Sequence, residues 1–152
     1  MSWQHGGLGP MQGQANHFVR YGKDKPSYAV QRYVGESERL YGILDNRLKD
    51  REWVVGNKFS IADMAIVGWA DIAMWSGMDL EQFPNVKKWI DRCYERPAVQ
   101  KGFAIPSASG VSNGAMSKQL AEGNDEVVKR EKEAHERIRK AKEEWDYKYA
   151  SP

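Results

Sequence analysis

Apolar side chains in residues 2–103 recur at intervals of three and four positions, which is the repeat of an amphipathic helix. No segment in this range shows the strict alternation of apolar and polar residues that marks a half-buried strand. The clearest helix is predicted over 27–49, and a later one begins near Pro84 and ends before Pro97. The sequence therefore predicts an all-α fold, a bundle of helices.

One helix start carries a specific hydrogen-bonding signature. In the run from Ser60 to Asp63, the serine hydroxyl can accept from the Asp63 amide while the Asp63 carboxylate accepts from the Ser60 amide. The residues that follow, up to Trp75, leave hardly any polar face. We therefore predict a capping box that opens a central helix, buried on most sides.

Composition divides the chain into three parts. Residues 1–103 hold most of the tryptophans and are predicted to form the helical domain. Residues 104–124 are rich in glycine and serine and are predicted to be a linker. Residues 125–152 carry balanced charges with acids four positions before bases, which favours an extra charged helix. Its thin apolar stripe leaves two readings open, a solvated or lightly docked helix and a partner-binding helix.

Charge and composition exclude several classes of protein. Hydrophobic residues make up 41% and the net charge is only +2, so we expect neither a membrane protein nor a nucleic-acid-binding protein. The single cysteine, Cys93, permits neither an internal disulfide nor a cysteine metal cluster. We expect no metal site and a reduced, cytoplasmic protein.

Several motifs, taken in order along the chain, resemble the C-terminal helical domain of the glutathione transferases. The resemblance is to the fungal and bacterial kind related to the yeast nitrogen-regulator prion protein and the bacterial nu class. It covers residues 2–103, and the capping-box motif matches the start of that domain's buried helix. The motifs that carry it lie at residues 6–18, 29–33, 59–64, 84–89 and 96–99.

The resemblance implies glutathione as the cofactor and a hydrophobic small molecule as the substrate. In the family, a thioredoxin-like domain holds most of the glutathione and activates its thiol. We find no counterpart of that domain in these 152 residues, so we expect another domain or a second chain to supply it. A homodimer or a complex with a partner chain is therefore expected.

Four residues are predicted to bind glutathione on the strength of this resemblance. Arg32 aligns with an arginine that reaches a glutathione carboxylate in similar enzymes, and a guanidinium suits such a pair. The alternative is a surface arginine that pairs with Glu36, four residues on. Gln14, Asn16 and His17 lie where the family's cleft opens and could donate hydrogen bonds, although such residues also cap turns or line interfaces.

The same resemblance suggests an apolar wall for the substrate, made by Met11, Phe18, Trp69 and Trp75. For Trp69 the alternative is packing in the core, because its helix is apolar nearly all round. Cys93 matches no nucleophile of the family and is expected to be a buried, inert thiol. No catalytic residue is assigned from the sequence.

Two classes of function follow. The first is an enzyme of the glutathione transferase type that conjugates the thiol to an apolar electrophile, or uses it to isomerise a double bond. The second is a non-catalytic helical domain that binds small molecules or mediates assembly.

Overall fold

The structure of the protein, a computed structural model, describes residues 1–145. Over this range it contains helices and turns but no β-strand, which confirms the predicted all-α fold. Short π-helical turns, η1 (Gln4–Leu8) and η2 (His17–Tyr21), extend α1 at both ends. None of the described helices is both long and apolar enough to cross a bilayer. The α-helices in chain order are α1 (Gly9–Asn16), α2 (Ser27–Leu48), α3 (Ile61–Ala70), α4 (Pro84–Tyr94), α5 (Pro97–Phe103), α6 (Asn113–Ala121) and α7 (Asp125–Trp145).

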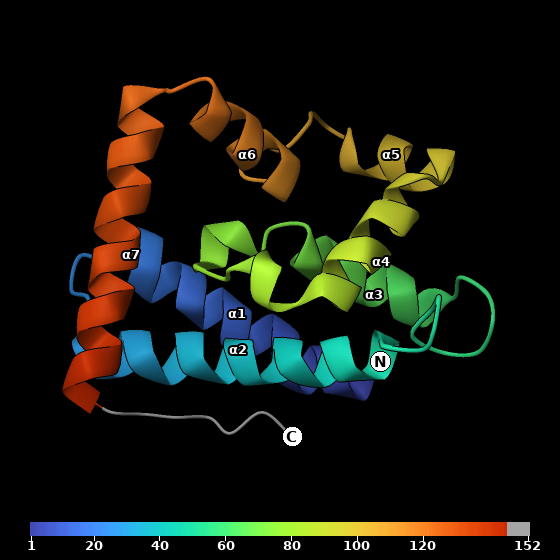
Figure 1. The fold of residues 1–152 in the computed structure, drawn as a ribbon, viewed down its shortest axis with the longest axis horizontal. Coiled ribbons are helices and arrows are strands. Elements are labelled where there is room, and N and C mark those ends of the chain that lie inside the picture. The colour runs from blue at the N-terminus through green and yellow to red at the C-terminus, as the bar shows by residue number, and fades with distance from the viewer. Residues whose placement is uncertain (146–152) are drawn as a thin grey trace.

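Helices α1 and α2 run side by side and form the base of the molecule as drawn in Figure 1. The predicted helix over 27–49 is confirmed as α2. Its apolar stripe, including Val30, Val34 and Leu44, joins one core cluster with Leu8 of η1. Burial of this stripe stabilises the pair, since each fully buried aliphatic side chain contributes roughly 1.5–3 kcal/mol.

The start of α3 is fixed by the predicted capping box between Ser60 and Asp63, which is confirmed. The Asp63 side chain is 0% exposed and accepts hydrogen bonds from the Ser60 amide at 2.9 Å and the Val54 amide at 3.0 Å. It also accepts a hydrogen bond from Nε1 of Trp89 in α4, at 2.9 Å. One carboxylate therefore holds α3, α4 and the connection before α3 together.

Helices α4 and α5 begin at Pro84 and Pro97, where a missing amide hydrogen costs nothing. The orphan amides at the start of α4 are satisfied from α2. Asp45 accepts from the amides of Asn85 and Val86 at 2.8 and 3.0 Å. This contact fixes α4 across α2 and positions Trp89 over Asp63.

Residues 104–124 differ from the predicted linker, because helix α6 lies within them. Asn113 donates from Nδ2 to the carbonyl of Ala70 at 2.7 Å and accepts from the amide of Met74 at 3.0 Å. Met116, one turn on, is 0% exposed. One buried amide and one buried methionine make no periodic apolar pattern, so the composition indicated a loop. They nevertheless attach α6 to the segment that follows α3.

The predicted charged helix is present as α7 and packs against the N-terminal half of α2 (Figure 1). Ala134, Ile138 and Ala141 are buried in the same core cluster as α2. The reading as a solvated or lightly docked helix underestimated this contact, because small alanines look weak in a sequence yet let helices approach closely. Residues 146–152, the end of the predicted tail, lie outside the described residues. Whether residues 1–103 fold without this helix stays a prediction.

Candidate functional site

A groove of about 610 Å³ lies between α1 and α3. Its lining includes Gln4, Gln14 and the partly buried indole of Trp69. A β-carbon at Gly9 would lie 3.1 Å from the Trp69 ring, and one at Gly13 would lie 3.5 Å from it. Gly9 therefore lets the indole rest against the backbone of α1, whereas a β-carbon at Gly13 would make an ordinary contact with it. The ring forms one wall of the groove.

The face of α3 that contributes Ala65 to this groove is exposed. Ile61 is 66% exposed and Met64 is 57% exposed, whereas Ile66 and Val67 on the other side are buried. The prediction that this helix is buried on most sides is wrong for the outer face, because α1 and α4 cover only part of it. An apolar surface thus lies next to the groove.

Two buried glutamines lie at the groove, Gln4 in its lining and Gln12 beneath it. Gln12 donates from Nε2 to the carbonyl of Trp69 at 2.8 Å and accepts from the Tyr41 hydroxyl at 3.0 Å. Burial raises the pKa of Tyr41, so its phenol stays neutral. Gln4 is 4% exposed, and its Oε1 has no hydrogen-bond partner among the described residues. Sequence reasoning missed both glutamines, although each lies four positions from Leu8 on the buried helical face.

Of the four residues predicted to bind glutathione, only Gln14 lines this groove. Asn16 is 9% exposed, and its buried Oδ1 has no hydrogen-bond partner in the part of the chain that is described. His17 is exposed at the junction of α1 and η2, and Arg32 is exposed on α2. The structure therefore does not gather these four side chains around one described cavity.

Arg32 lies one turn before Glu36 on α2. The pKa of Glu36 is lowered chiefly by its hydrogen bond from Arg39, and the charge of Arg32 adds to the effect. This electrostatic contact agrees with the surface pairing that the sequence left open.

Of the four residues predicted to form the apolar wall, only Trp69 lines the groove. Met11 is partly buried and packs against the core. Phe18 stacks in parallel on Tyr33 of α2, with ring centres 5.5 Å apart. Trp75 borders a different and smaller cavity, of about 270 Å³.

Trp75 takes part in the contact between η2 and α7. The guanidinium groups of Arg20 and Arg130 each lie 4.6 Å from its ring centre, and its Nε1 donates to the Tyr21 hydroxyl at 2.8 Å. Arg20 also pairs through two hydrogen bonds of 2.8 Å with the carboxylate of Glu131. These contacts indicate a structural role for Trp75.

The buried titratable groups point to binding and packing. Burial raises the pKa of the Cys93 thiol to about 12, as expected for an inert thiol. Asp71 and Tyr94 share a hydrogen bond, and burial raises the pKa of both. Among residues 1–145 no three His, Cys, Asp or Glu side chains group closely enough to hold a metal ion.

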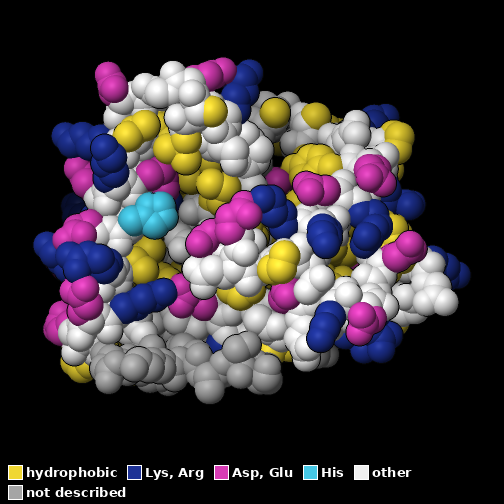
Figure 2. All heavy atoms as spheres, viewed as in Figure 1, with side chains coloured by type: hydrophobic (Ala, Val, Ile, Leu, Met, Phe, Trp, Pro, Cys, Tyr) yellow, Lys and Arg dark blue, Asp and Glu magenta, His cyan; other side chains and the backbone are white. Residues whose placement is uncertain are grey.

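A larger cavity, of about 790 Å³, is bounded by α2, α4, α6 and α7, and we call it the α6–α7 cavity. In the space-filling view, hydrophobic side chains lie in the hollow between α6 and α7, with acidic and basic side chains nearby (Figure 2). None of the predicted site residues lines it. This cavity was not predicted from the sequence, because the segment that forms α6 was predicted to be a linker.

Comparison with known proteins identifies the helical core. Residues 11–97 match the family model for the glutathione S-transferase C-terminal domain. Disulfide-bond oxidoreductase YfcG of Escherichia coli is 43% identical over 96 residues, which cover 63% of this chain and 45% of that protein. Transcriptional regulator URE2 of Saccharomyces cerevisiae is 31% identical over 134 residues, with 66% of this chain and 38% of that protein covered.

Solved structures agree with the sequence match. A glutathione transferase homolog from Lodderomyces elongisporus, with two GSH per subunit, superposes with a TM-score of 0.65 at 39% identity. The match covers 68% of this chain and 50% of that one. This chain thus spans about half the length of the relatives it matches, or less. It belongs to the glutathione S-transferase family and carries that family's C-terminal domain.

Proposed function

We propose that this chain works as the helical, substrate-binding half of a glutathione transferase-type protein. The groove between α1 and α3 holds the apolar part of an electrophilic small molecule beside the sulfur of glutathione. The observation that carries this proposal is the Trp69 indole, which forms a wall of the groove and rests against the backbone of α1 at Gly9. Gln14 and the unpartnered Oε1 of Gln4 supply polar groups at the same place.

The reaction would be thiol conjugation or glutathione-assisted isomerisation of a double bond. Cys93, Tyr41 and Tyr94 all have raised pKa values, so none of them is suited to deprotonate the glutathione thiol. In this proposal a thioredoxin-like domain activates the thiol. The glutathione bound to relatives of solved structure supports glutathione as the cofactor.

Calorimetry with glutathione and S-hexylglutathione tests the groove. We expect glutathione to bind this chain with a dissociation constant on the order of millimolar or weaker, a few kcal/mol of binding free energy. S-hexylglutathione should bind more tightly, because its alkyl chain can lie on Trp69. Trp69→Ala should remove that gain, while Trp145→Ala should not, because Trp145 lies at the end of α7 against Ser27 and Tyr28 and does not line the groove. Micromolar binding of glutathione, or an equal loss in both variants, would count against the proposal.

The second candidate is a non-catalytic helical module that binds ligands or mediates assembly. The raised pKa values of the buried thiol and phenols favour it, because they leave this chain with binding groups only. A thiol-conjugation assay with an aryl halide separates the two candidates, first with this chain and then with a cell extract added. Conjugation that rises above the sum of chain and extract supports the enzyme, whereas no gain supports the module.

We also propose a homodimer or a complex with a partner chain, in a reducing cytoplasm. The exposed apolar face of α3, with Ile61 and Met64, supports association, because such surfaces mark contact sites. Sedimentation velocity of the wild type and of Met64→Glu measures it. A wild type that sediments as a monomer at all concentrations would reject self-association.

A further inference from the structure

The α6–α7 cavity has the size of a ligand site. Its volume of about 790 Å³ lies within the range of roughly 300–1,000 Å³ that is typical of small-molecule pockets. One part of its wall lies within the family match, at the 3-10 turns η3 (Met74–Ser76) and η4 (Leu80–Gln82) and at α4. The other part comes from α6 and α7, beyond residue 97 where the family match ends. Helices α6 and α7 therefore help to enclose a space that is separate from the groove between α1 and α3.

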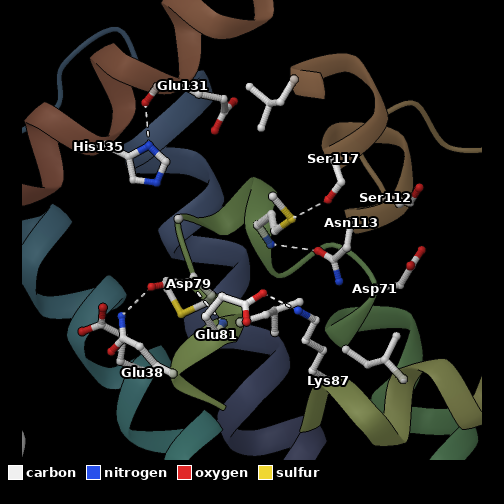
Figure 3. A pocket seen from close by; sticks show the side chains of 18 of the residues that line it. Glu38, Asp71, Asp79, Glu81, Lys87, Ser112, Asn113, Ser117, Glu131 and His135 are labelled. Carbon is white, nitrogen blue, oxygen red and sulfur yellow. Dashed lines mark hydrogen bonds and ion pairs between the residues drawn. The ribbon is translucent and has the colours of Figure 1, made fainter. Parts of the chain in front are cut away.

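Much of the wall is apolar and adaptable. The sulfur of Met74 lies 3.6 Å from the Ser117 hydroxyl, so this thioether spans from η3 to α6 (Figure 3). Methionine side chains are flexible and polarizable and fit organic groups of varied shape. The apolar lining consists of Met74, Met78, Leu80, Ile90, Leu120 and Ile138.

The charged lining is mostly acidic. Six carboxylates face two lysines and one histidine: Glu38, Asp71, Asp79, Glu81, Asp91 and Glu131 against Lys87, Lys142 and His135 (Figure 3). Three of these acids are already paired, Glu38 with Lys142, Glu81 with Lys87 and Glu131 with Arg20 from behind the wall. The described structure shows no ion pair for the other three, Asp71, Asp79 and Asp91, although the charges of Asp79 and Asp91 also act on Lys87. The carboxylates still outnumber the cations, so the cavity holds an excess of negative charge.

Asp71 is the most deeply placed of these three acids, with 3% of its surface exposed. Its side chain shares a hydrogen bond with the Tyr94 hydroxyl, and burial raises its pKa because no cation compensates the lost solvation. A positive group in the cavity would relieve that penalty. The described acids and His135 form no cluster suited to a metal ion, which leaves an organic cation as the complementary ligand.

We propose that the α6–α7 cavity binds a small amphipathic organic cation, a protonated amine on an aliphatic body. The ammonium group lies near Asp71 and Asp91, and the aliphatic part lies against Met74 and Met78. The acidic lining excludes anions, and the apolar wall favours such an ion over a hydrated inorganic cation. The ligand belongs to a site distinct from the proposed glutathione groove.

Hexylammonium chloride and hexan-1-ol are the probes, and NMR of protein with ¹³C-labelled methionine methyl groups is the readout. We expect hexylammonium to shift the Met74 and Met78 signals and to leave Met11 and Met64 unchanged, since these two do not line the cavity. Hexan-1-ol should shift the same two signals but bind at least tenfold more weakly. The absence of any shift with hexylammonium would overturn the proposal, as would equal shifts at all four methionines.

Matched variants distinguish the effect of the Asp71 charge on binding from the effect of the space in the cavity. Asp71→Asn keeps a group that can accept the Tyr94 hydrogen bond, and it should weaken hexylammonium at least tenfold while leaving hexan-1-ol nearly unchanged. Asp50→Asn, outside the cavity, should change neither. Ser117→Trp fills the cavity without changing its charge and should abolish binding of both probes.

If Asp71→Asn lowers the melting temperature, Asp91→Asn on α4 replaces it as the test variant, because Asp91 is exposed. Its expected loss of hexylammonium affinity is smaller, about threefold. If hexylammonium binds Ser117→Trp as tightly as the wild type, the ligand lies elsewhere and the proposed cavity site is wrong. Unchanged affinity in both aspartate variants would reject the role of the acids.

Discussion

Two buried carboxylates hold this molecule together in different ways. Asp63, 0% exposed, accepts from two backbone amides, the Ser60 hydroxyl and one indole, all neutral donors. Glu131, 5% exposed, instead pairs with the guanidinium of Arg20 at the far end of the core. The first anchors the family domain, and the second attaches the additional helix α7 to it.

Asp63 and the pair of Arg20 and Glu131 stabilise the fold in two different ways. Neutral donors around Asp63 lose their only acceptor when it is removed, and buried amides have little water to turn to. The Arg20 and Glu131 pair gains attraction but must offset the desolvation of two charges, so its net contribution is small while the cost of breaking it is large. The free energy of unfolding should therefore respond differently at the two sites when one member of each interaction is removed.

The largest loss is expected from Asp63→Ala. Three donors, the Ser60 and Val54 amides and the Trp89 indole, would be left without an acceptor. We expect the free energy of unfolding to fall by about 4 kcal/mol, measured by urea denaturation and thermal melts. Ser60→Ala, which removes only a capping hydroxyl, should cost about 1 kcal/mol. A melting point equal to that of the wild type would show that the capping box is not needed.

Glu131→Ala comes next, because it leaves the Arg20 charge buried with no carboxylate partner, only the carbonyls of Trp75 and Met74 and the face of the Trp75 ring. We expect a loss of about 3 kcal/mol. The double variant Arg20→Met with Glu131→Leu removes both charges and should recover part of that loss. If the double variant were less stable than the single one, attraction between the charges would outweigh their desolvation.

A smaller loss is expected where α7 crosses η3, at Gly77. This residue has φ of 84°, a left-handed conformation, and a β-carbon there would overlap Cδ1 of Ile138. Gly77→Ala should therefore cost about 2 kcal/mol. Gly102→Ala is the matched control, because its β-carbon would enter open space, and it should be neutral or slightly stabilising. Equal melting points for the two variants would contradict the close approach of α7.

The difference between a local contact and a long-range contact also explains how much of the fold could be predicted from the sequence. The capping box at Ser60 and Asp63 is local, because its two residues are only three positions apart, and the sequence alone was enough to predict it. Helix α7 was predicted from its charge spacing, but its docking depends on Arg20 and Glu131, 111 positions apart, and no local pattern connects them. Helix α6 was missed because its anchors, Asn113 and Met116, are isolated residues in a polar segment.

The candidate site was predicted less well than the fold. The resemblance predicted Gln14 at the family's cleft and left Trp69 open between a substrate wall and the core, and both line the groove. The α6–α7 cavity escaped prediction because its wall combines segments from α2, α4, α6 and α7. The burial of Asp71 depends on that packing, and a single aspartate carries no sign of it in the sequence.

The smallest signal is expected from Cys93, and it distinguishes the two carboxylates most directly. The thiol is 0% exposed, its pKa is raised to about 12 chiefly by burial, and the charge of Asp63 adds to the rise. At neutral pH it is therefore a protonated, covered thiol that a chromogenic disulfide reagent should label only when the structure opens. Asp63→Ala loosens the contact between α3 and α4 beside this thiol, so we expect labelling to accelerate strongly. Glu131→Ala loosens α7 instead, and it should change the labelling rate little where opening is local. Equal acceleration in the two variants would mean that α7 and the family domain open as one cooperative unit.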